Sequence, residues 1–416
     1  MKKSLSPNQI VTLLGIGTSV SLLGESTLYT VLPNEHIIQQ LGITLAMVGI
    51  LLGTNRAMRL FTNGPIGLLY EKAPRRPLLV LSLILGALSS VLYTIGYGFW
   101  PLFAGRVSWG LAWSLLWIGC KTVVQEISTN ENRGHFNGRY NIFYFFGIGF
   151  ASLLGAMLTD LVGFSSGQRI SAGLLLITAV IWYFWLPETR GAVSRQAVRS
   201  QEQIAEQKKA EAIPWKVILP AAFVIFTSRF IERGLVAATT PLWMAGLFGE
   251  GARVLGFLIP IASLTGLFNA VKVFPGIASA PLSGRLSDKL SRRWPVVAWT
   301  LVVGAIGLFL MSKRLTFLAV AGGLMIPVLS ASVETLVPAI IGDHTGKANN
   351  GRALGVIFIF ADLGSTLGPM IGLGLLDATV FSIEQLYLFC ALLILAAVGV
   401  AWSSAGKSKP SLQAVK

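Results

Sequence analysis

Long apolar stretches alternate with short polar breaks along almost the whole chain. A helix needs about 20 apolar residues to cross the hydrocarbon core of a bilayer. The breaks between the stretches are rich in Gly, Pro or charged residues, which end helices or favour water. The pattern therefore predicts twelve membrane-spanning helices, at residues 9–31, 43–69, 77–99, 101–124, 138–163, 168–186, 215–247, 252–283, 295–312, 315–341, 352–378 and 382–404.

One break is much longer than the others and divides the predicted helices into two sets of six. It covers residues 187–214 and is rich in charged residues, as expected of a solvated linker. The fold class predicted from this pattern is an all-α membrane protein built from two six-helix bundles. Its expected parts are the N-terminal bundle 1–186, the cytoplasmic linker 187–214, the C-terminal bundle 215–404 and the cytoplasmic tail 405–416.

The composition supports a membrane location, and the placement of the basic residues predicts the orientation of the chain. Only 12% of residues are charged and the mean hydropathy is +0.69, whereas soluble domains carry about 25% charged residues. The net charge of +15 could indicate nucleic acid, but basic residues also gather in cytoplasmic loops. With the N-terminus inside, 22 basic residues lie in inner segments, 4 in outer segments and 7 within spans. We therefore expect a multi-pass protein of the plasma (cell inner) membrane with both termini cytoplasmic and no nucleic-acid partner.

Two decapeptides share one pattern at an offset of 217 residues. These two cassettes are GLLYEKAPRR, which begins at Gly67, and GRLSDKLSRR, which begins at Gly284. At the same offset, glycines of the fifth predicted span match glycines of the eleventh, namely Gly138, Gly147 and Gly155 with Gly355, Gly364 and Gly372. The two bundles are therefore expected to be pseudo-symmetric copies of one six-helix unit, and parallel repeats of this kind are a transporter architecture.

Several motifs together resemble those of the major facilitator superfamily. The decapeptide pair resembles its loop signature, LFAGRVSWG from Leu102 resembles its fourth-span motif, and LPETRG from Leu186 looks like the end of its N-terminal half. GSTLGPMIG from Gly364 is similar to an antiporter Gly-Pro element, displaced here into the eleventh span. The resemblance covers nearly the whole chain. The chain departs from the pattern at Glu71, which replaces Asp, at Pro74, which replaces Gly, and in the fifth span, which lacks the Pro.

The resemblance implies a gate between the two halves on the cytoplasmic side. Glu71 would face Arg352, and Asp288 would face Arg133 near Gly138. The expected gating set is Gly67, Glu71, Lys72, Glu126, Arg133, Gly284, Asp288, Lys289 and Arg352. Gly67 and Gly284, the first residues of the two cassettes, are expected to allow two helices to approach closely. Glu126 could pair with the cassette arginines, but Arg75, Arg76, Arg292 and Arg293 are expected to act only as topogenic charge.

Ionisable residues inside the predicted spans are candidates for function. A charge near mid-bilayer costs at least about 2.5 kcal/mol, so it marks a functional site or an aqueous cavity. Trp109, Trp113 and Trp117 share a helical stripe with Arg106. The predicted substrate-binding residues are therefore Arg56, Arg59, Arg106, Arg229, Arg233 and Lys272, together with the three tryptophans. The alternatives are structural ion pairs, packed tryptophans and, for Lys121, a side chain that snorkels to the inner surface.

Four intramembrane carboxyl groups are candidate proton carriers. A low-dielectric cavity favours the neutral form of a carboxyl group. Glu25 and Glu232, which occupy related positions in the repeat, are the first candidates, and Glu334 and Asp362 are the next. Each of them could instead be one half of an ion pair.

These features predict a secondary transporter with rocker-switch alternating access. We expect proton-coupled export of a small organic, amphipathic or anionic solute by a monomer. Proton-coupled uptake or exchange of a small organic anion is the alternative, and a non-transporting membrane sensor or scaffold is the alternative of another class. The chain carries no nucleotide-binding loop, and its three histidines and its cysteines Cys120 and Cys390 are scattered. It is therefore not expected to be an enzyme or to hold a metal or cofactor.

Overall fold

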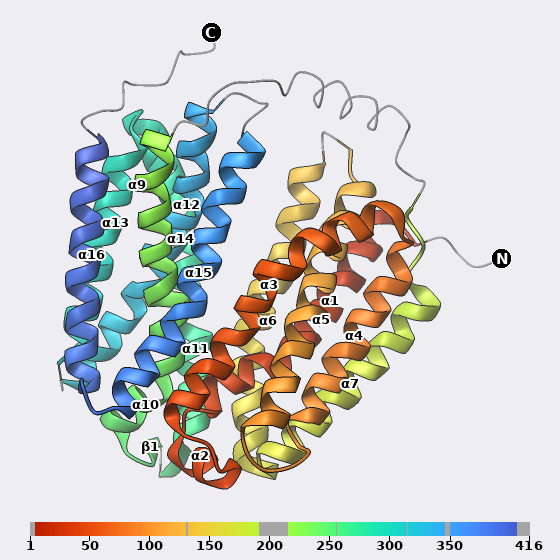
Figure 1. Ribbon diagram of the computed structural model, residues 1–416, viewed down its shortest axis with the longest axis horizontal. Coiled ribbons are helices and arrows are strands. Elements are labelled where there is room, and N and C mark those ends of the chain that lie inside the picture. The colour runs from red at the N-terminus through yellow and green to blue at the C-terminus, as the bar shows by residue number, and fades with distance from the viewer. Residues whose placement is uncertain are drawn as a thin grey trace. The chain divides into compact units, whose positions relative to one another are not determined.

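The computed structural model contains two compact units, which are described one at a time (Figure 1). The first unit comprises Met1–Val198 with Thr240–Ala270, and the second comprises Arg199–Thr239 with Val271–Lys416. The structure describes residues 5–129, 132–190, 215–254, 256–313, 315–345 and 350–405. The expected linker from residue 191 onward and the expected tail from residue 406 lie outside the described residues.

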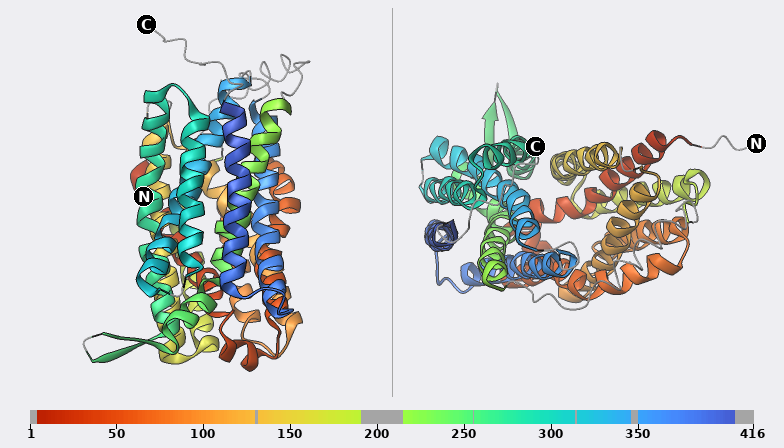
Figure 2. Two further views of the ribbon diagram at one scale, coloured as in Figure 1. Left: turned by 90° about the vertical axis from the view of Figure 1, so that its left-hand side faces the viewer. Right: turned by 90° about the horizontal axis from the view of Figure 1, so that it is seen from above.

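Helices make up the first unit, with one short hairpin. In chain order its elements are α1 (Pro7–Val31), α2 (Glu35–Leu41), α3 (Leu45–Lys72), α4 (Arg75–Leu92), α5 (Phe99–Glu126), α6 (Arg133–Val162), α7 (Phe164–Trp185), most of α10 (Ala237–Phe248), β1 (Gly251–Val254), β2 (Phe257–Pro260) and α11 (Ile261–Val271). The antiparallel strands β1 and β2 form the ribbon seen in the left panel of Figure 2.

Helices are the only regular secondary structure among the described residues of the second unit. It contains α9 (Trp215–Arg229), the π-helix η1 (Phe230–Val236), α12 (Val273–Leu290), α13 (Arg293–Met311), α14 (Thr316–His344), α15 (Asn350–Asp377) and α16 (Ile383–Ala405). The right panel of Figure 2 shows the long helices of each unit nearly end-on, so within a unit they run roughly parallel or antiparallel.

Local sequence signals explain where several helices begin. Ser6 caps α1 in a reciprocal capping box with Gln9, and Pro7 occupies the first turn, where its missing N–H is not needed. The Thr44 hydroxyl accepts a hydrogen bond from the Met47 N–H at the start of α3. Gly42 ends α2 with φ of 64°, a conformation that favours glycine. The chain bends by 88° between α2 and α3.

The prediction of an all-α membrane protein is confirmed, with differences at the span edges. Ten helices in the described residues are long and apolar enough to cross a membrane, and the α2–α3 pair would be an eleventh. The one remaining expected span, 215–247, corresponds to α9, η1 and α10, which follow one another in the chain without a gap. The expected span 252–283 was placed too early, because residues 251–260 form the hairpin and the helix begins at Ile261. The short apolar runs there have a high hydropathy that does not distinguish a strand from a helix.

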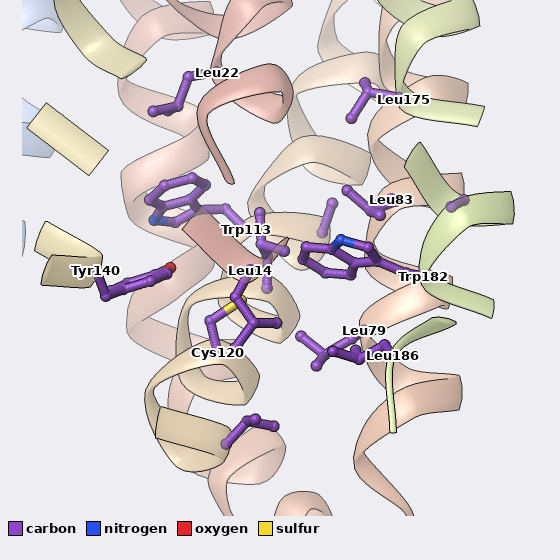
Figure 3. Packing of buried hydrophobic residues seen from close by; sticks show 14 of the residues in the cluster. Leu14, Leu22, Leu79, Leu83, Trp113, Cys120, Tyr140, Leu175, Trp182 and Leu186 are labelled. Atoms are coloured by element: carbon purple, nitrogen blue, oxygen red, sulfur yellow. The ribbon is translucent and has the colours of Figure 1, made fainter. Parts of the chain in front are cut away.

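Large apolar side chains from five helices fill the core of the first unit. Leu14, Leu83 and Trp182 are among the residues buried there. Figure 3 shows the Tyr140 ring with its hydroxyl directed into the same cluster, beside Leu14 and Cys120. The Tyr140 hydroxyl lies 3.0 Å from the Thr18 hydroxyl, so this buried polar group has a partner.

The repeated glycines lie where helices approach closely within each unit. A side chain at Gly147 or Gly155 would collide with α1, at Ser19 and Thr27 respectively. At the offset of 217, their counterparts Gly364 and Gly372 would collide with α9 and η1, at Phe226 and Leu235. The two glycine sets therefore have the same packing role, as the repeat predicts.

Close packing does not explain the other glycines of the repeat. A Cβ atom added at Gly67, Gly138 or Gly284 would meet no atom within 4 Å among the described residues. Within the described part of each unit, no close helix approach occurs at Gly67 or Gly284, so the expectation that they permit one stays a prediction for the gate between the halves. These glycines lie near helix ends with open space beside them, whereas tight approach occurs deeper in the bundles.

Replacing Gly368 by alanine is expected to destabilise the second unit by about 1–3 kcal/mol, the usual cost of overpacking. The new methyl group would collide with the Phe230 carbonyl oxygen and lie 2.6 Å from the Gly234 Cα atom, and neither backbone atom can move alone. Gly374→Ala on the same helix is the matched control, because nothing lies within 4 Å of its Cβ position. Thermal unfolding in detergent measures both variants, and equal unfolding temperatures would contradict the expectation.

Candidate functional site

A buried ion pair joins three helices of the first unit. The Arg106 guanidinium on α5 donates two hydrogen bonds to the Glu25 carboxylate on α1, one from Nη1 to Oε2 and one from Nη2 to Oε1 (3.3 Å). Its Nε atom donates to the Leu51 carbonyl of α3 at 2.8 Å. The Asn55 amide donates to Glu25 Oε1 at 2.8 Å. The side chains of Arg106 and Glu25 are only 1% and 10% exposed, so the pair is enclosed by protein.

This pairing changes the interpretation of the fourth-span motif. Arg106 was predicted to bind substrate, but its donors are directed to Glu25 and to backbone carbonyls of α3. Trp109 and Trp113 are 4% and 7% exposed and belong to the core of the unit. The inference that Arg106 and these two tryptophans line a cavity is therefore wrong here, because a guanidinium avoids lipid equally well by pairing inside a bundle. Trp117 is only half-buried.

A second cluster of charges lies within the second unit, where α9 passes into η1. Glu334 Oε1 on α14 lies 3.2 Å from Arg229 Nη2 and 3.5 Å from Arg233 Nη2. Arg233 Nε lies 3.1 Å from Glu232 Oε2. These four side chains keep between 12% and 25% of their surface exposed, so they are less enclosed than the Glu25–Arg106 pair. A π-helical turn in a longer helix is frequently found at a functional site.

Ser330 connects the two carboxylates of this cluster. Its hydroxyl oxygen lies 3.1 Å from Glu232 Oε2 and 3.2 Å from Glu334 Oε1. A hydroxyl has one proton, so it can donate a hydrogen bond to only one of the two carboxylates at a time. It can accept a hydrogen bond from the other carboxyl group only if that carboxyl group is protonated. The Ser330 hydroxyl therefore lies within hydrogen-bond distance of both carboxylates and bridges them. Ser330 was not among the predicted site residues. It lies one helical turn before Glu334, so the two side chains share one face of α14.

The remaining predicted site residues are half-buried. Arg56 and Arg59 lie on α3, and Asp362 lies on α15. Lys272 occupies the break between α11 and α12, where it interacts electrostatically with Glu232 and Arg233. The second unit thus brings Glu334 and Lys272 to the neighbouring residues Arg229, Glu232 and Arg233.

The cassette arginines form ion pairs with acids at the ends of the helices that follow. Arg75 is buried and pairs with Glu126 at 2.6 Å, and the Thr189 hydroxyl donates to the same carboxylate at 2.5 Å. In the second unit Arg293 Nε lies 2.5 Å from Asp343 Oδ2. The expectation that these two arginines are only topogenic is wrong, because each fixes the end of one helix against another. The predicted candidate Glu126 is indeed a partner of Arg75.

Glu188 strengthens the same corner of the first unit. Its carboxylate accepts hydrogen bonds from the backbone N–H groups of Arg75 (2.8 Å), Arg76 (3.1 Å) and Arg190 (3.1 Å). Partial burial by itself would raise the pKa of Glu188, but these hydrogen bonds and the nearby Arg75 charge outweigh it and lower the pKa. Glu188 therefore stays ionised and anchors the start of α4.

The other predicted gating residues lie at exposed positions. Glu71, Lys72, Arg133, Lys289 and Arg352 are all exposed. Asp288 is 67% exposed and accepts a hydrogen bond from Arg293 Nη1 at 3.3 Å within its own unit. Its pairing with Arg133 stays a prediction.

The segment Thr240–Ala270 contacts α1 and α6 within the first unit. The Asp160 carboxylate of α6 accepts hydrogen bonds from the Ser263 N–H (2.9 Å) and hydroxyl (2.5 Å), in the first turn of α11. A Cβ atom at Gly266 would lie 2.7 Å from the Ser152 carbonyl oxygen. No sequence pattern predicted these contacts, because their residues are more than 100 positions apart.

Long apolar helices that enclose ion pairs define a multi-pass membrane protein. The sequence profile of the Major Facilitator Superfamily matches residues 14–273 and 270–414. The chain therefore belongs to the Major Facilitator Superfamily, as its motifs predicted.

Named relatives and a solved structure agree with this family. The class D tetracycline resistance protein of Salmonella ordonez is 26% identical over 90% of this chain and 89% of its own length. Multidrug resistance protein 2 of Bacillus subtilis (strain 168) is 22% identical over 96% of both chains. The fold is similar to that of a bacterial homologue of the human lysosomal transporter Spinster in an inward-facing, occupied conformation, with a TM-score of 0.76, 14% identity and coverage of 98% of this chain and 99% of that one.

Proposed function

We propose that the protein is a secondary active transporter that exports a small organic, amphipathic or anionic solute in exchange for protons. It would act as a monomer in the plasma membrane, by rocker-switch alternating access with both termini cytoplasmic. Family membership supports the transport role, and the tetracycline and multidrug resistance relatives support export.

The observation that carries proton coupling is the Glu232–Ser330–Glu334 arrangement beside two arginines and Lys272. Two carboxyl groups joined through one hydroxyl can take up or release a single proton without moving the backbone. Loss of that proton would change the balance of charge around Arg229 and Arg233, which remain candidate solute contacts. Asp362 is a further candidate carrier, whereas the bonding of Glu25 to Arg106 and Asn55 suits a structural pair better.

We also propose that the exposed cassette charges form a cytoplasmic gate. Glu71 would pair with Arg352, and Asp288 would exchange its bond to Arg293 for one to Arg133. The more extensive bonding of Arg75 and Arg293 suits them to keep each unit rigid while such a gate opens and closes.

Flux into inverted proteoliposomes tests the proposed function. We expect an acidic lumen to drive accumulation of at least one of tetracycline, ethidium and 2-naphthoate, and an alkaline lumen to give none. Accumulation that collapses with a protonophore would support coupling. Equal accumulation with and without the gradient would contradict export by proton exchange, and absence of flux for all three probes would contradict the substrate class.

Uptake or exchange of a small organic anion is the second candidate function. It is favoured by the balance of the candidate intramembrane charges named above, which are seven basic residues and four acids. Accumulation of 2-naphthoate together with protons, driven by an alkaline lumen, would identify this alternative.

A further inference from the structure

An aromatic cluster in the first unit holds a lysine that the proposed function does not use. Trp117 and Lys121 lie one turn apart on α5, and Tyr140 and Tyr144 lie one turn apart on α6. The Trp117 ring centroid is 4.8 Å from that of Tyr144 and 5.9 Å from that of Tyr140. The Lys121 ammonium lies 5.0 Å from the Trp117 centroid and 4.9 Å from the Tyr140 centroid.

The Lys121 side chain does not snorkel toward the end of its helix. Its ammonium donates a 2.7 Å hydrogen bond to Asn141 Oδ1 of α6. Lys121 is five residues before the end of α5, whereas Asn141 is eight residues beyond the start of α6. At about 1.5 Å per residue, the ammonium reaches a point about 12 Å into α6 from its start. The side chain therefore points toward α6 inside the bundle rather than toward the end of α5.

The partners of this ammonium within the described residues are neutral. They are the Asn141 carbonyl oxygen and the faces of Trp117 and Tyr140, and the ion pairs of the first unit involve other residues. An ammonium in a low-dielectric interior is costly unless an anion or several acceptors compensate it. Cation–π contacts offset part of that cost. An ammonium has three donors, and Asn141 uses only one.

The surroundings of Lys121 define what can complete its coordination. Trp117, Tyr144, Lys121 and Asn141 are all half-buried, so each keeps some accessible surface. Tyr140 is buried and held by its contact with the Thr18 hydroxyl, so this wall of the cluster is rigid. Trp117 is also stacked on Trp113 at 5.7 Å. The cluster thus presents one cation beside fixed aromatic surface.

We propose that Lys121, Trp117 and Tyr144 form a binding subsite for a flat organic carboxylate. The carboxylate would accept hydrogen bonds from Lys121, and its ring would pack against Trp117 and Tyr144. This inference rests on the proposed function for its role in transport, because it narrows the solute to an aromatic or conjugated anion. Binding itself can be tested without transport.

Calorimetric titration of the purified full-length protein tests the subsite with two ligands of the same shape. We expect 2-naphthoate to bind about tenfold more tightly than neutral 2-naphthamide, since only the carboxylate can pair with the ammonium. Lys121→Gln should remove this difference and Lys121→Arg should keep it. Trp117→Leu should weaken both ligands. Thermal unfolding confirms that each variant is folded.

The proposal is overturned if 2-naphthoate does not bind the wild-type protein or binds no better than the amide, and these two comparisons need no variant. It is also overturned if folded Lys121→Gln binds 2-naphthoate as tightly as the wild type does. Proteoliposome flux is measured separately. Charge-dependent binding without gradient-driven flux would leave the subsite standing and contradict the proposed function, and flux without charge-dependent binding would do the reverse.

Discussion

Replacing Arg106 by glutamine is expected to lower the free energy of unfolding by about 3–5 kcal/mol, the usual cost of removing one partner of a buried ion pair. The Glu25 carboxylate would keep only the Asn55 amide as a charge-compensating donor, in a site that is 10% exposed. The Leu51 and Leu52 carbonyl oxygens would also lose a donor. Denaturant or thermal unfolding in detergent measures the change.

The double variant Glu25→Leu with Arg106→Met tests whether the loss in Arg106→Gln comes from the unpaired Glu25 carboxylate. Replacing both members of a buried pair by apolar residues is often neutral or stabilising. We therefore expect this protein to recover much of the stability that Arg106→Gln loses. If the double variant were as unstable as the single one, the hydrogen bonds to α3 would matter more than the ion pair.

The same double variant separates two roles of Glu25. A purely structural pair predicts that gradient-driven flux survives in the folded double variant. A proton carrier at Glu25 predicts that this flux is lost while exchange of solute for solute continues. Because the carboxylate is bonded to a guanidinium and an amide, we expect the structural result.

Replacing Glu334 by glutamine is expected to reduce gradient-driven flux by about 10²-fold or more, as for other losses of a positioned proton-transfer group. Glutamine keeps the size of the side chain but cannot exchange a proton with Glu232 through Ser330. It would also leave Arg229 and Arg233 without the carboxylate they share. Solute-for-solute exchange, which needs no net proton movement, should fall much less.

Serine variants of α14 give this prediction a matched control. Ser330→Ala removes the hydroxyl that connects the two carboxyl groups, and Ser330→Thr keeps it, so only the first should slow coupled flux. Ser332 is equally buried, and its hydroxyl oxygen has no hydrogen-bond partner among the described side chains and backbone. Ser332→Ala should therefore leave flux unchanged. Normal coupled flux in folded Glu334→Gln would exclude Glu334 as a carrier, and equal losses in both alanine variants would exclude a specific relay.

The two sites also show how far the residue pattern alone reaches. The contact of Glu232 with Arg233 needs no packing information, since the two are neighbours in the chain. The pairing of Glu334 with Arg229 could not be predicted, because it depends on how α14 packs against α9 and η1. For Arg106, helical periodicity placed the tryptophans on its face correctly, but that face is turned into the core of the unit.

The sequence by itself determined the membrane class, the repeat and the family. Span length is fixed by bilayer thickness, and a duplicated motif remains visible at a constant offset, so neither needs coordinates. Only the tertiary structure decided which charges neutralise one another. The ion-pair and side-chain amide partners of Glu25, Arg75, Lys121 and Glu334 are 20 to 105 residues away. Electrostatic energy depends on distance in space and on burial, and these arise only when the helices pack.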